Sequence, residues 1–292
     1  MLSNHRPLAE NNAVLLISCE DRKGITARVT NFIYHHDGNI VHADQHIDGQ
    51  AKTFFMRVEW ELDGFSLDKE EILDIFGPIA REYNMAWELH LTAEPTRVAI
   101  FVSRHMHCLI DLLLRQMAGH FSCEIPLIIS NHAFARAIAE EFDIEFHEMP
   151  VSPENKREQE DKQIELLKAK KVELIVLARY HQILTPEFVG EFKDRIINIH
   201  HSFLPAFIGA NPYAQAYKKG VKIIGATSHF VTEKLDEGPI IAQETVGVTH
   251  RDSLDDMVRK GEDLEKMVLS KAVRLALEKK ILRYGNKTVV FE

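Results

Sequence analysis

From residue 97 onward the sequence alternates short apolar runs with stretches whose apolar residues recur at helical spacing, and this alternation constrains the fold most strongly. The apolar runs at 97–102, 125–129 and 172–177 have the length and composition of strands that are buried on both faces. Strands that alternate with helices form parallel βαβ units, with helices on both faces of the sheet. We therefore predict an α/β, Rossmann-like domain with a mostly parallel sheet.

The part of the chain before this alternation has a different order of elements. Apolar runs typical of strands lie at 13–19, 39–47, 53–62 and 85–91. An amphipathic stretch follows the first run, and another, which begins with a capping box of Asp68 and Glu71, follows the third. This βαββαβ order predicts a ferredoxin-like fold. Because the segment 92–95 suits a linker, we predict two domains, 1–94 and 95–292.

Composition narrows the classes of function. A net charge of −9 and the lack of a strongly basic stretch argue against a nucleic-acid partner. No apolar run approaches the roughly 18 residues that span a bilayer, and the polar N-terminus has no secretory signal, so we expect a cytoplasmic protein without membrane contact. Cys19, Cys108 and Cys123 lack CxxC spacing and the chain has no HExxH motif. We therefore expect reduced thiols and no metal site.

Four polar residues lie at the ends of apolar runs in the segment 196–239, namely Asn198, His200, His229 and Asp236. Strand ends are where open α/β folds place their chemistry. An amide can donate to a developing oxyanion, an imidazolium adds positive charge, and a carboxylate favours that imidazolium and can position water. No serine or cysteine with a base partner is evident, so the pattern favours direct attack on a small carbonyl. By spacing alone, polar residues that cap turns explain the pattern equally well.

Ordered motifs at 176–184, 198–200, 202–205, 225–231 and 235–240 together indicate a family. On these motifs the chain resembles the 10-formyltetrahydrofolate-dependent formyltransferase superfamily. Over its whole length it is similar to the deformylases, which are the hydrolases of that superfamily. In that family the N-terminal βαββαβ unit is an ACT domain.

The resemblance implies a role for each matching polar residue. Asn198 would bind the formyl oxygen, and His200, as an imidazolium, would stabilise the tetrahedral oxyanion. Asp236 would orient His200 and position the attacking water, acting directly or by relay as the base. His229 and His201 would support the same pocket.

The resemblance also implies the substrate. Gln182, Ile183 and Leu184 match the segment that lines the pterin pocket, so 10-formyltetrahydrofolate is the expected substrate and no further cofactor is implied. Glycinamide ribonucleotide transformylases cradle their acceptor's phosphate with a glycine-containing loop, whereas this chain has no glycine at 103–108. Water is therefore the expected acceptor. The products would be formate, which would supply purine biosynthesis, and tetrahydrofolate, which would balance the one-carbon folate pool.

Two other functions stay open at this point, a formyltransferase that uses a non-phosphorylated amine and a non-catalytic amino-acid-sensing protein. ACT domains commonly bind amino acids and pair subunits, so the resemblance implies methionine or glycine as an effector and a homo-oligomer. Asp21, Gly24 and Ile25 would form the effector loop, although a solvated turn between strand and helix explains these residues at least as well.

Overall fold

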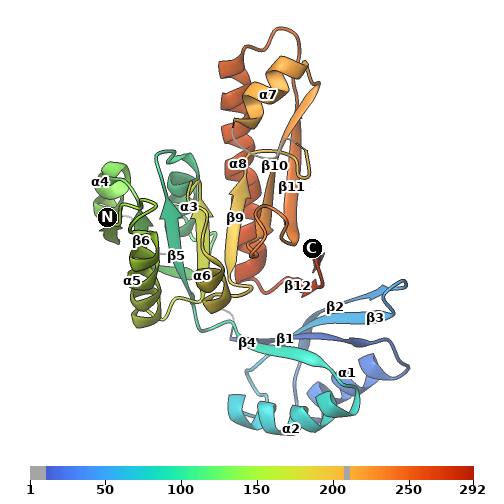
Figure 1. The fold of residues 1–292 in the computed structure, drawn as a ribbon. Coiled ribbons are helices and arrows are strands. Elements are labelled where there is room, and N and C mark those ends of the chain that lie inside the picture. The colour runs from blue at the N-terminus through green and yellow to red at the C-terminus, as the bar shows by residue number, and fades with distance from the viewer. Residues whose placement is uncertain (1–10, 207–210) are drawn as a thin grey trace. The chain divides into compact units, whose positions relative to one another are not determined.

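The computed structural model describes residues 11–206 and 211–292, which form two compact units (Figure 1). Unit 1 runs through Pro95 and also takes in Glu278–Tyr284 and Thr288–Glu292. Unit 2 comprises Thr96–Leu277 and Gly285–Lys287. Most of the C-terminal end, which the sequence assigned to the second domain, therefore belongs with unit 1. Within the described ranges, no helix is both long and apolar enough to cross a membrane.

Unit 1 consists of an antiparallel sheet and two helices that pack on one of its faces (Figure 1). In chain order its elements are β1 (Asn12–Glu20), α1 (Ile25–His35), β2 (Ile40–Asp48), β3 (Thr53–Glu61), α2 (Lys69–Glu82) and β4 (Ala86–Leu91). The strand order is β2-β3-β1-β4, and every neighbouring pair is antiparallel. Large apolar side chains such as Trp60 and Phe76 are fully buried in the core of this unit. The predicted ferredoxin-like fold is confirmed.

The end of the chain packs on this sheet. Strands β12 (Ile281–Tyr284) and β13 (Lys287–Val290) form a small two-stranded sheet. The Tyr284 ring lies 4.6 Å from the ring of Phe55, and its hydroxyl donates a hydrogen bond of 2.8 Å to Asp48 Oδ2. These contacts explain why the C-terminal strands belong with unit 1.

Unit 2 is a sheet with helices on both sides (Figure 1). In chain order its elements are β5 (Thr96–Val102), α3 (His107–Met117), β6 (Cys123–Ser130), η1 (Ala133–Ala135), α4 (Arg136–Glu141), β7 (Glu145–Glu148), α5 (Lys156–Ala169), β8 (Leu174–Ala178), α6 (Pro186–Glu191), β9 (Ile196–His200), α7 (Pro212–Lys219), β10 (Ile223–Phe230), β11 (Ile240–Gly247) and α8 (Leu254–Leu277). The strand order is β11-β10-β9-β8-β5-β6-β7. Pairing is parallel from β9 to β7, whereas β10 is antiparallel to both of its neighbours. The predicted mostly parallel sheet is confirmed.

The centre of this sheet positions the site. All five residues of β8 are buried, as expected for a strand covered on both faces. Strands β8 and β9 are parallel neighbours, so their carboxyl ends lie at the same edge of the sheet. In open α/β folds this edge is where ligands bind.

Candidate active site

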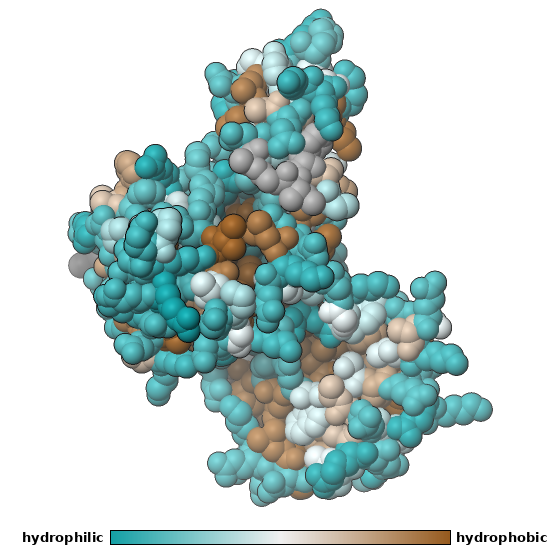
Figure 2. Space-filling model, viewed as in Figure 1, coloured by the Kyte–Doolittle hydropathy of each residue, from teal (hydrophilic) through white to brown (hydrophobic). Residues whose placement is uncertain are grey.

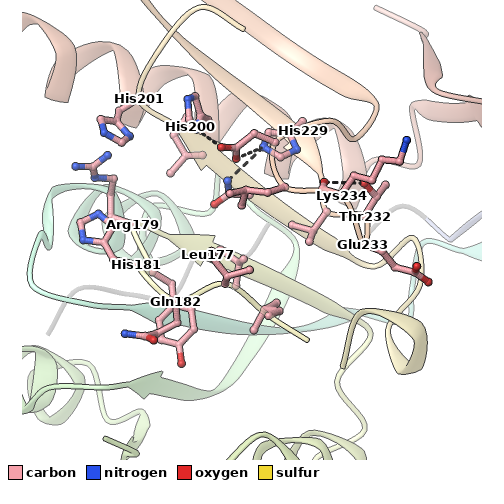
Figure 3. A pocket seen from close by; sticks show the side chains of 18 residues that line it. Leu177, Arg179, His181, Gln182, His200, His201, His229, Thr232, Glu233 and Lys234 are labelled. Carbon is pink, nitrogen blue, oxygen red and sulfur yellow. Dashed lines mark hydrogen bonds and ion pairs between the residues drawn. The ribbon is translucent and has the colours of Figure 1, made fainter. Parts of the chain in front are cut away.

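A cavity of about 380 Å³ opens at the carboxyl ends of β8 and β9 (Figure 3). It is lined by Leu177, Arg179, Tyr180, His181, Gln182, Ile183, Leu184, Asn198, Ile199, His200, His201, His229, Val231, Thr232, Glu233, Lys234, Leu235 and Asp236. Among these, the apolar side chains of Ile183 and Leu235 are 60% and 55% exposed. Figure 2 shows hydrophobic residues gathered in a hollow of unit 2 among hydrophilic ones. An apolar wall with a few convergent polar groups is typical of a small-molecule site.

Four of the predicted site residues form one hydrogen-bonded and ionic group in this cavity (Figure 3). Asp236 Oδ2 lies 3.2 Å from His200 Nδ1, and Asp236 Oδ1 lies 3.7 Å from His229 Nε2. The amide nitrogen of Asn198 lies 3.2 Å from the same His229 Nε2. The side chains of His200, His229 and Asp236 are at most 10% exposed. The structure therefore brings an amide, two imidazoles and a carboxylate together away from bulk water.

Strand geometry explains why these residues meet. Asn198 and His200 are two positions apart on β9, so both side chains point to the same face. His229 on β10 pairs directly with Asn198 across the antiparallel ladder, next to an irregularity between Ser228 and His229. Bulges of this kind re-aim side chains beside active sites. Asp236 follows in the loop after β10, with a left-handed backbone (φ 55°) that Asp tolerates better than most residues.

The charges in this group are set by its neighbours. Burial by itself raises the pKa of the Asp236 carboxyl, but the His200 and His229 rings outweigh burial and hold that pKa well below its usual range. Asp236 is therefore an anion at neutral pH. His200 Nε2 is buried and has no hydrogen-bond partner among the described residues. A buried imidazole nitrogen with no protein partner is available to a bound ligand.

The remaining histidines of the cavity are electrically neutral. Burial, and after it the nearby Arg179 guanidinium, lowers the pKa of His201 to about 3 and the pKa of His181 to about 4. His201 lies beside His200, with ring centroids 5.4 Å apart. The expected pterin-lining residues Gln182, Ile183 and Leu184 all line the same cavity.

The expected effector residues lie in unit 1 and not in this cavity. Asp21 is exposed in the turn after β1, and Gly24 has a left-handed backbone (φ 93°) just before α1. Ile25 begins α1 and is only 1% exposed, because it packs in the core. The Ile25 side chain is therefore part of the core, and the effector role of Asp21, Gly24 and Ile25 stays a prediction.

The structure also shows a buried ionic cluster that the motifs did not indicate. Glu265 on α8 is fully buried and accepts hydrogen bonds from His107 Nε2 at 2.8 Å and from the Tyr213 hydroxyl at 2.6 Å. Arg179 Nε lies 3.3 Å from Glu265 Oε2. The one local signal in the sequence is Gly261 within α8, because glycine is unfavourable inside a helix and can mark a close contact.

Part of this cluster has the donor atoms of a metal site. The ligand atoms of His107, Cys108 and Glu265 lie within 4.8 Å of one another. Burial, followed by the charge of Glu265, raises the pKa of the Cys108 thiol well above its usual range, so the thiol is protonated. Metals bind the thiolate, and both Glu265 oxygens already accept hydrogen bonds from His107 and Tyr213. These residues suit an internal ion-pair cluster better than a metal site.

Comparison with known proteins connects this geometry to a family. A formyl transferase family model matches residues 96–273, and an ACT domain model matches residues 13–77. The chain is 53% identical over 279 residues to the formyltetrahydrofolate deformylase of Synechocystis, covering 96% of this chain and 98% of that protein. It is 43% identical over 281 residues to the deformylase of Escherichia coli K12, covering 95% and 97% of the two chains.

Solved structures agree with these relatives. The crystal structure of a formyltetrahydrofolate deformylase from Pseudomonas syringae superposes with a TM-score of 0.95 at 45% identity, covering 97% of this chain and 95% of that chain. Glycinamide ribonucleotide transformylase 1 from Symbiobacterium toebii superposes with a TM-score of 0.65 at 29% identity, covering 70% of this chain and 98% of that chain. The similarity to the deformylases thus extends over both units.

Proposed function

Because the chain belongs to the formyltetrahydrofolate deformylase family, we propose that it hydrolyses 10-formyltetrahydrofolate to formate and tetrahydrofolate. The observation that carries this proposal is the buried His200–Asp236 pair, which lies beside Asn198 in a cavity with an apolar wall. These residues supply a donor for the formyl oxygen, a cation for the developing charge and an anion that can hold water.

The oxyanion side is formed by Asn198 and His200. One N–H of the Asn198 amide is directed at His229, which fixes the amide and leaves the second N–H for the formyl oxygen. His200 presents Nε2, which has no partner in the described part of the chain, to the same oxygen. Preorganised donors of this kind lower the barrier by a few kcal/mol, since they cost no reorganisation during the reaction.

Asp236 supports the attack by water. Its carboxylate accepts from His200 Nδ1 and compensates the positive charge of that ring while the oxyanion forms, and its ionised state lets it position a water against the formyl carbon. The water oxygen bonds to carbon and the carbon–N10 bond breaks. One proton of the water passes to N10, directly or through His200, and the other is lost when formic acid ionises. Every step uses water and groups already in the cavity.

The acceptor side of the site favours water over a phosphorylated amine. In the loop at 103–108, the Ser103 hydroxyl donates to Asn131 and accepts from the backbone N–H of His181. His107, the first residue of α3, is bound to Glu265. These groups are engaged with the protein, and the loop lacks the glycines that permit close backbone approach to phosphate. His201, a neutral ring beside His200, further reduces the space for an acceptor larger than water.

The substrate contacts, the effector and the oligomeric state are inferred from the family. We infer that Gln182, Ile183 and Leu184 contact the pterin and that the reaction needs no cofactor beyond water and the folate substrate. We also infer that the ACT domain binds an amino acid, methionine or glycine, near Asp21 and Gly24, that the chain forms a homo-oligomer, and that it works in the cytoplasm. The formate released would serve purine biosynthesis.

The decisive experiment is an incubation of the purified protein with 10-formyltetrahydrofolate and no amine. Formate and tetrahydrofolate should accumulate over many turnovers, because water is the acceptor. A protein that stays idle until an amine is added would instead be a formyltransferase. Amino-acid binding without any turnover would identify a sensor. A panel of amino acids added to the same assay tests the effector, and a flat response would contradict it.

A further inference from the structure

Arg179 is an unusual residue in the wall of the cavity. It follows β8 directly, its backbone is left-handed (φ 64°), and its side chain is only 10% exposed. A left-handed backbone is unfavourable for arginine by roughly 1 kcal/mol, so the surrounding structure must hold it there. The turn is fixed by the backbone of Ser103, whose N–H donates to the Arg179 carbonyl oxygen at 3.2 Å.

The Arg179 guanidinium forms an ion pair with Glu265 but no hydrogen bond with it. Its Nε lies 3.3 Å from Glu265 Oε2 without the alignment of a hydrogen bond. Within the described ranges, its two terminal amino groups have no hydrogen-bond partner. Of the guanidinium, only Nε is buried without a hydrogen-bond partner, so the two terminal amino groups are open to the cavity that Arg179 lines, where a ligand can accept hydrogen bonds from them.

Glu265 is built into the fold as the counter-ion. Tyr213 reaches it only because α8 has a glycine one turn earlier. A Cβ at Gly261 would lie 2.1 Å from the Tyr213 ring. Burial favours the neutral carboxyl, but hydrogen bonds from His107 and Tyr213, together with the charge of Arg179, keep the pKa of Glu265 below its ordinary value. The Arg179 guanidinium is therefore a permanent cation in the wall of the cavity, and Glu265, which does not line the cavity, compensates its charge.

The surroundings of the Arg179 guanidinium suit the binding of a carboxylate. Figure 3 shows the guanidinium between the rings of His181 and His201, and both rings are neutral. Across the cavity lies the buried carboxylate of Asp236, which would repel a newly formed carboxylate product. Two parallel N–H groups of an arginine match the two oxygens of a carboxylate.

We propose that Arg179 is a formate subsite, in which the two terminal amino groups bind the two oxygens of the product while Glu265 holds the guanidinium from behind. This inference rests on the proposed hydrolysis, because only water as acceptor yields a carboxylate. Transfer to an amine would leave a neutral formamide. One formate oxygen comes from the formyl group and the other from water, and the two become equivalent when formic acid ionises, so the pair of amino groups meets a symmetrical carboxylate.

The test measures formate binding without relying on turnover. Isotopically labelled sodium formate is titrated into the folate-free protein and followed by NMR, with sodium chloride keeping the ionic strength constant. Formate is also tested as a product inhibitor of the amine-free reaction. In Arg179→Met both affinities should fall by about tenfold to a hundredfold, as expected for loss of charge-assisted hydrogen bonds. The surface variant Arg136→Met loses a pair with Glu148 and a contact with the Phe146 ring, neither of which lines the cavity, and should match the wild type.

Two further variants separate ligand binding from a structural role. The double variant Arg179→Met/Glu265→Gln removes both buried charges, so it avoids an uncompensated carboxylate, and it should also lose formate binding. Glu265→Gln alone leaves the cation in place and should bind formate at least as tightly as the wild type. A merely structural pair predicts instead that Glu265→Gln loses as much binding as Arg179→Met.

Each contrary outcome has a definite meaning. Formate affinity that is equal in Arg179→Met and the wild type overturns the inference. The same holds if Arg179→Met raises only the KM for 10-formyltetrahydrofolate, because Arg179 would then contact the folate. If the wild type releases no formate in the amine-free assay, the proposed function fails, whereas titration with formate alone still reports on the subsite.

Discussion

Replacing Asp236 by asparagine removes a charge from the centre of the site and leaves the shape almost unchanged. The side chain is 10% exposed, and asparagine tolerates the left-handed backbone at this position as well as aspartate does. Asp236 Oδ2 and His200 Nδ1 are 3.2 Å apart. At an effective dielectric constant of about 20, two unit charges at that separation attract by about 5 kcal/mol.

If that attraction is fully developed when His200 is an imidazolium, its loss lowers kcat by about 1,000- to 10,000-fold. The KM should change by less than about threefold, because the carboxylate is paired with His200 and His229 and, among the described residues, no hydrogen bond or ion pair joins it to Gln182, Ile183 or Leu184. Formate release measured with a coupled dehydrogenase gives kcat, and calorimetry with tetrahydrofolate confirms that the folate still binds. Glu237→Gln is the matched control, since Glu237 makes the same change of charge next in sequence but is 64% exposed. A kcat for Asp236→Asn within tenfold of the wild type would refute the assigned role.

Three further changes test the packing and electrostatics around the site. Gly261→Ala should lower the free energy of unfolding, measured by urea titration, by about 2 kcal/mol, because the added Cβ overlaps the Tyr213 ring. The control Gly190→Ala, whose added Cβ has no atom within 4 Å, should be neutral or stabilising in the same titration. His201 has a pKa of about 3 in the folded chain and about 6.5 when unfolded, so the unfolded state binds more protons between these values. Stability therefore falls with falling pH, by at most about 1.4 kcal/mol per unit, and His201→Gln should flatten that slope between about pH 6 and pH 4; an unchanged slope would contradict a neutral buried ring. Asp68→Ala should cost about 1 kcal/mol through loss of the α2 cap, and no loss would contradict the capping role.

Local features of the fold could be predicted because each signal lies within a short window. The capping box of Asp68 and Glu71 marks the start of α2, and the structure shows both of its hydrogen bonds. Proline inside a helix usually kinks or breaks it, yet Pro78 lies within one continuous helix, Lys69–Glu82. Periodicity also gave the order of strands and helices in both units.

Long-range pairing could not be predicted from the same patterns. An apolar run shows that a strand is buried but carries no information about its neighbours, so the antiparallel β10 and β11 at one side of the sheet were not foreseen. The predicted second domain, 95–292, includes the C-terminal strands for the same reason, whereas most of their residues belong with unit 1. Their contact through Tyr284 and Asp48 joins residues 236 positions apart.

In the candidate site, too, the local arrangement could be predicted and the long-range contacts could not. Asn198 and His200 lie on one face of one strand, so their proximity follows from the spacing, although Asn198 proved to be in the middle of β9 and not at its end. The cluster of Arg179 and Glu265 joins residues from separate elements. Arg179 belongs to the motif at 176–184, but nothing in that motif pairs it with a residue of α8. Only the packing of α8 reveals that Gly261 serves this cluster.

The central claim is that water is the acceptor of the formyl group. The most direct test is an amine-free incubation with 10-formyltetrahydrofolate in heavy-oxygen water, followed by mass spectrometry of the formate and by assay of tetrahydrofolate. We predict equal amounts of the two products, with one labelled oxygen in each formate. Formate without the label, or tetrahydrofolate that forms only after an amine is added, would contradict the account.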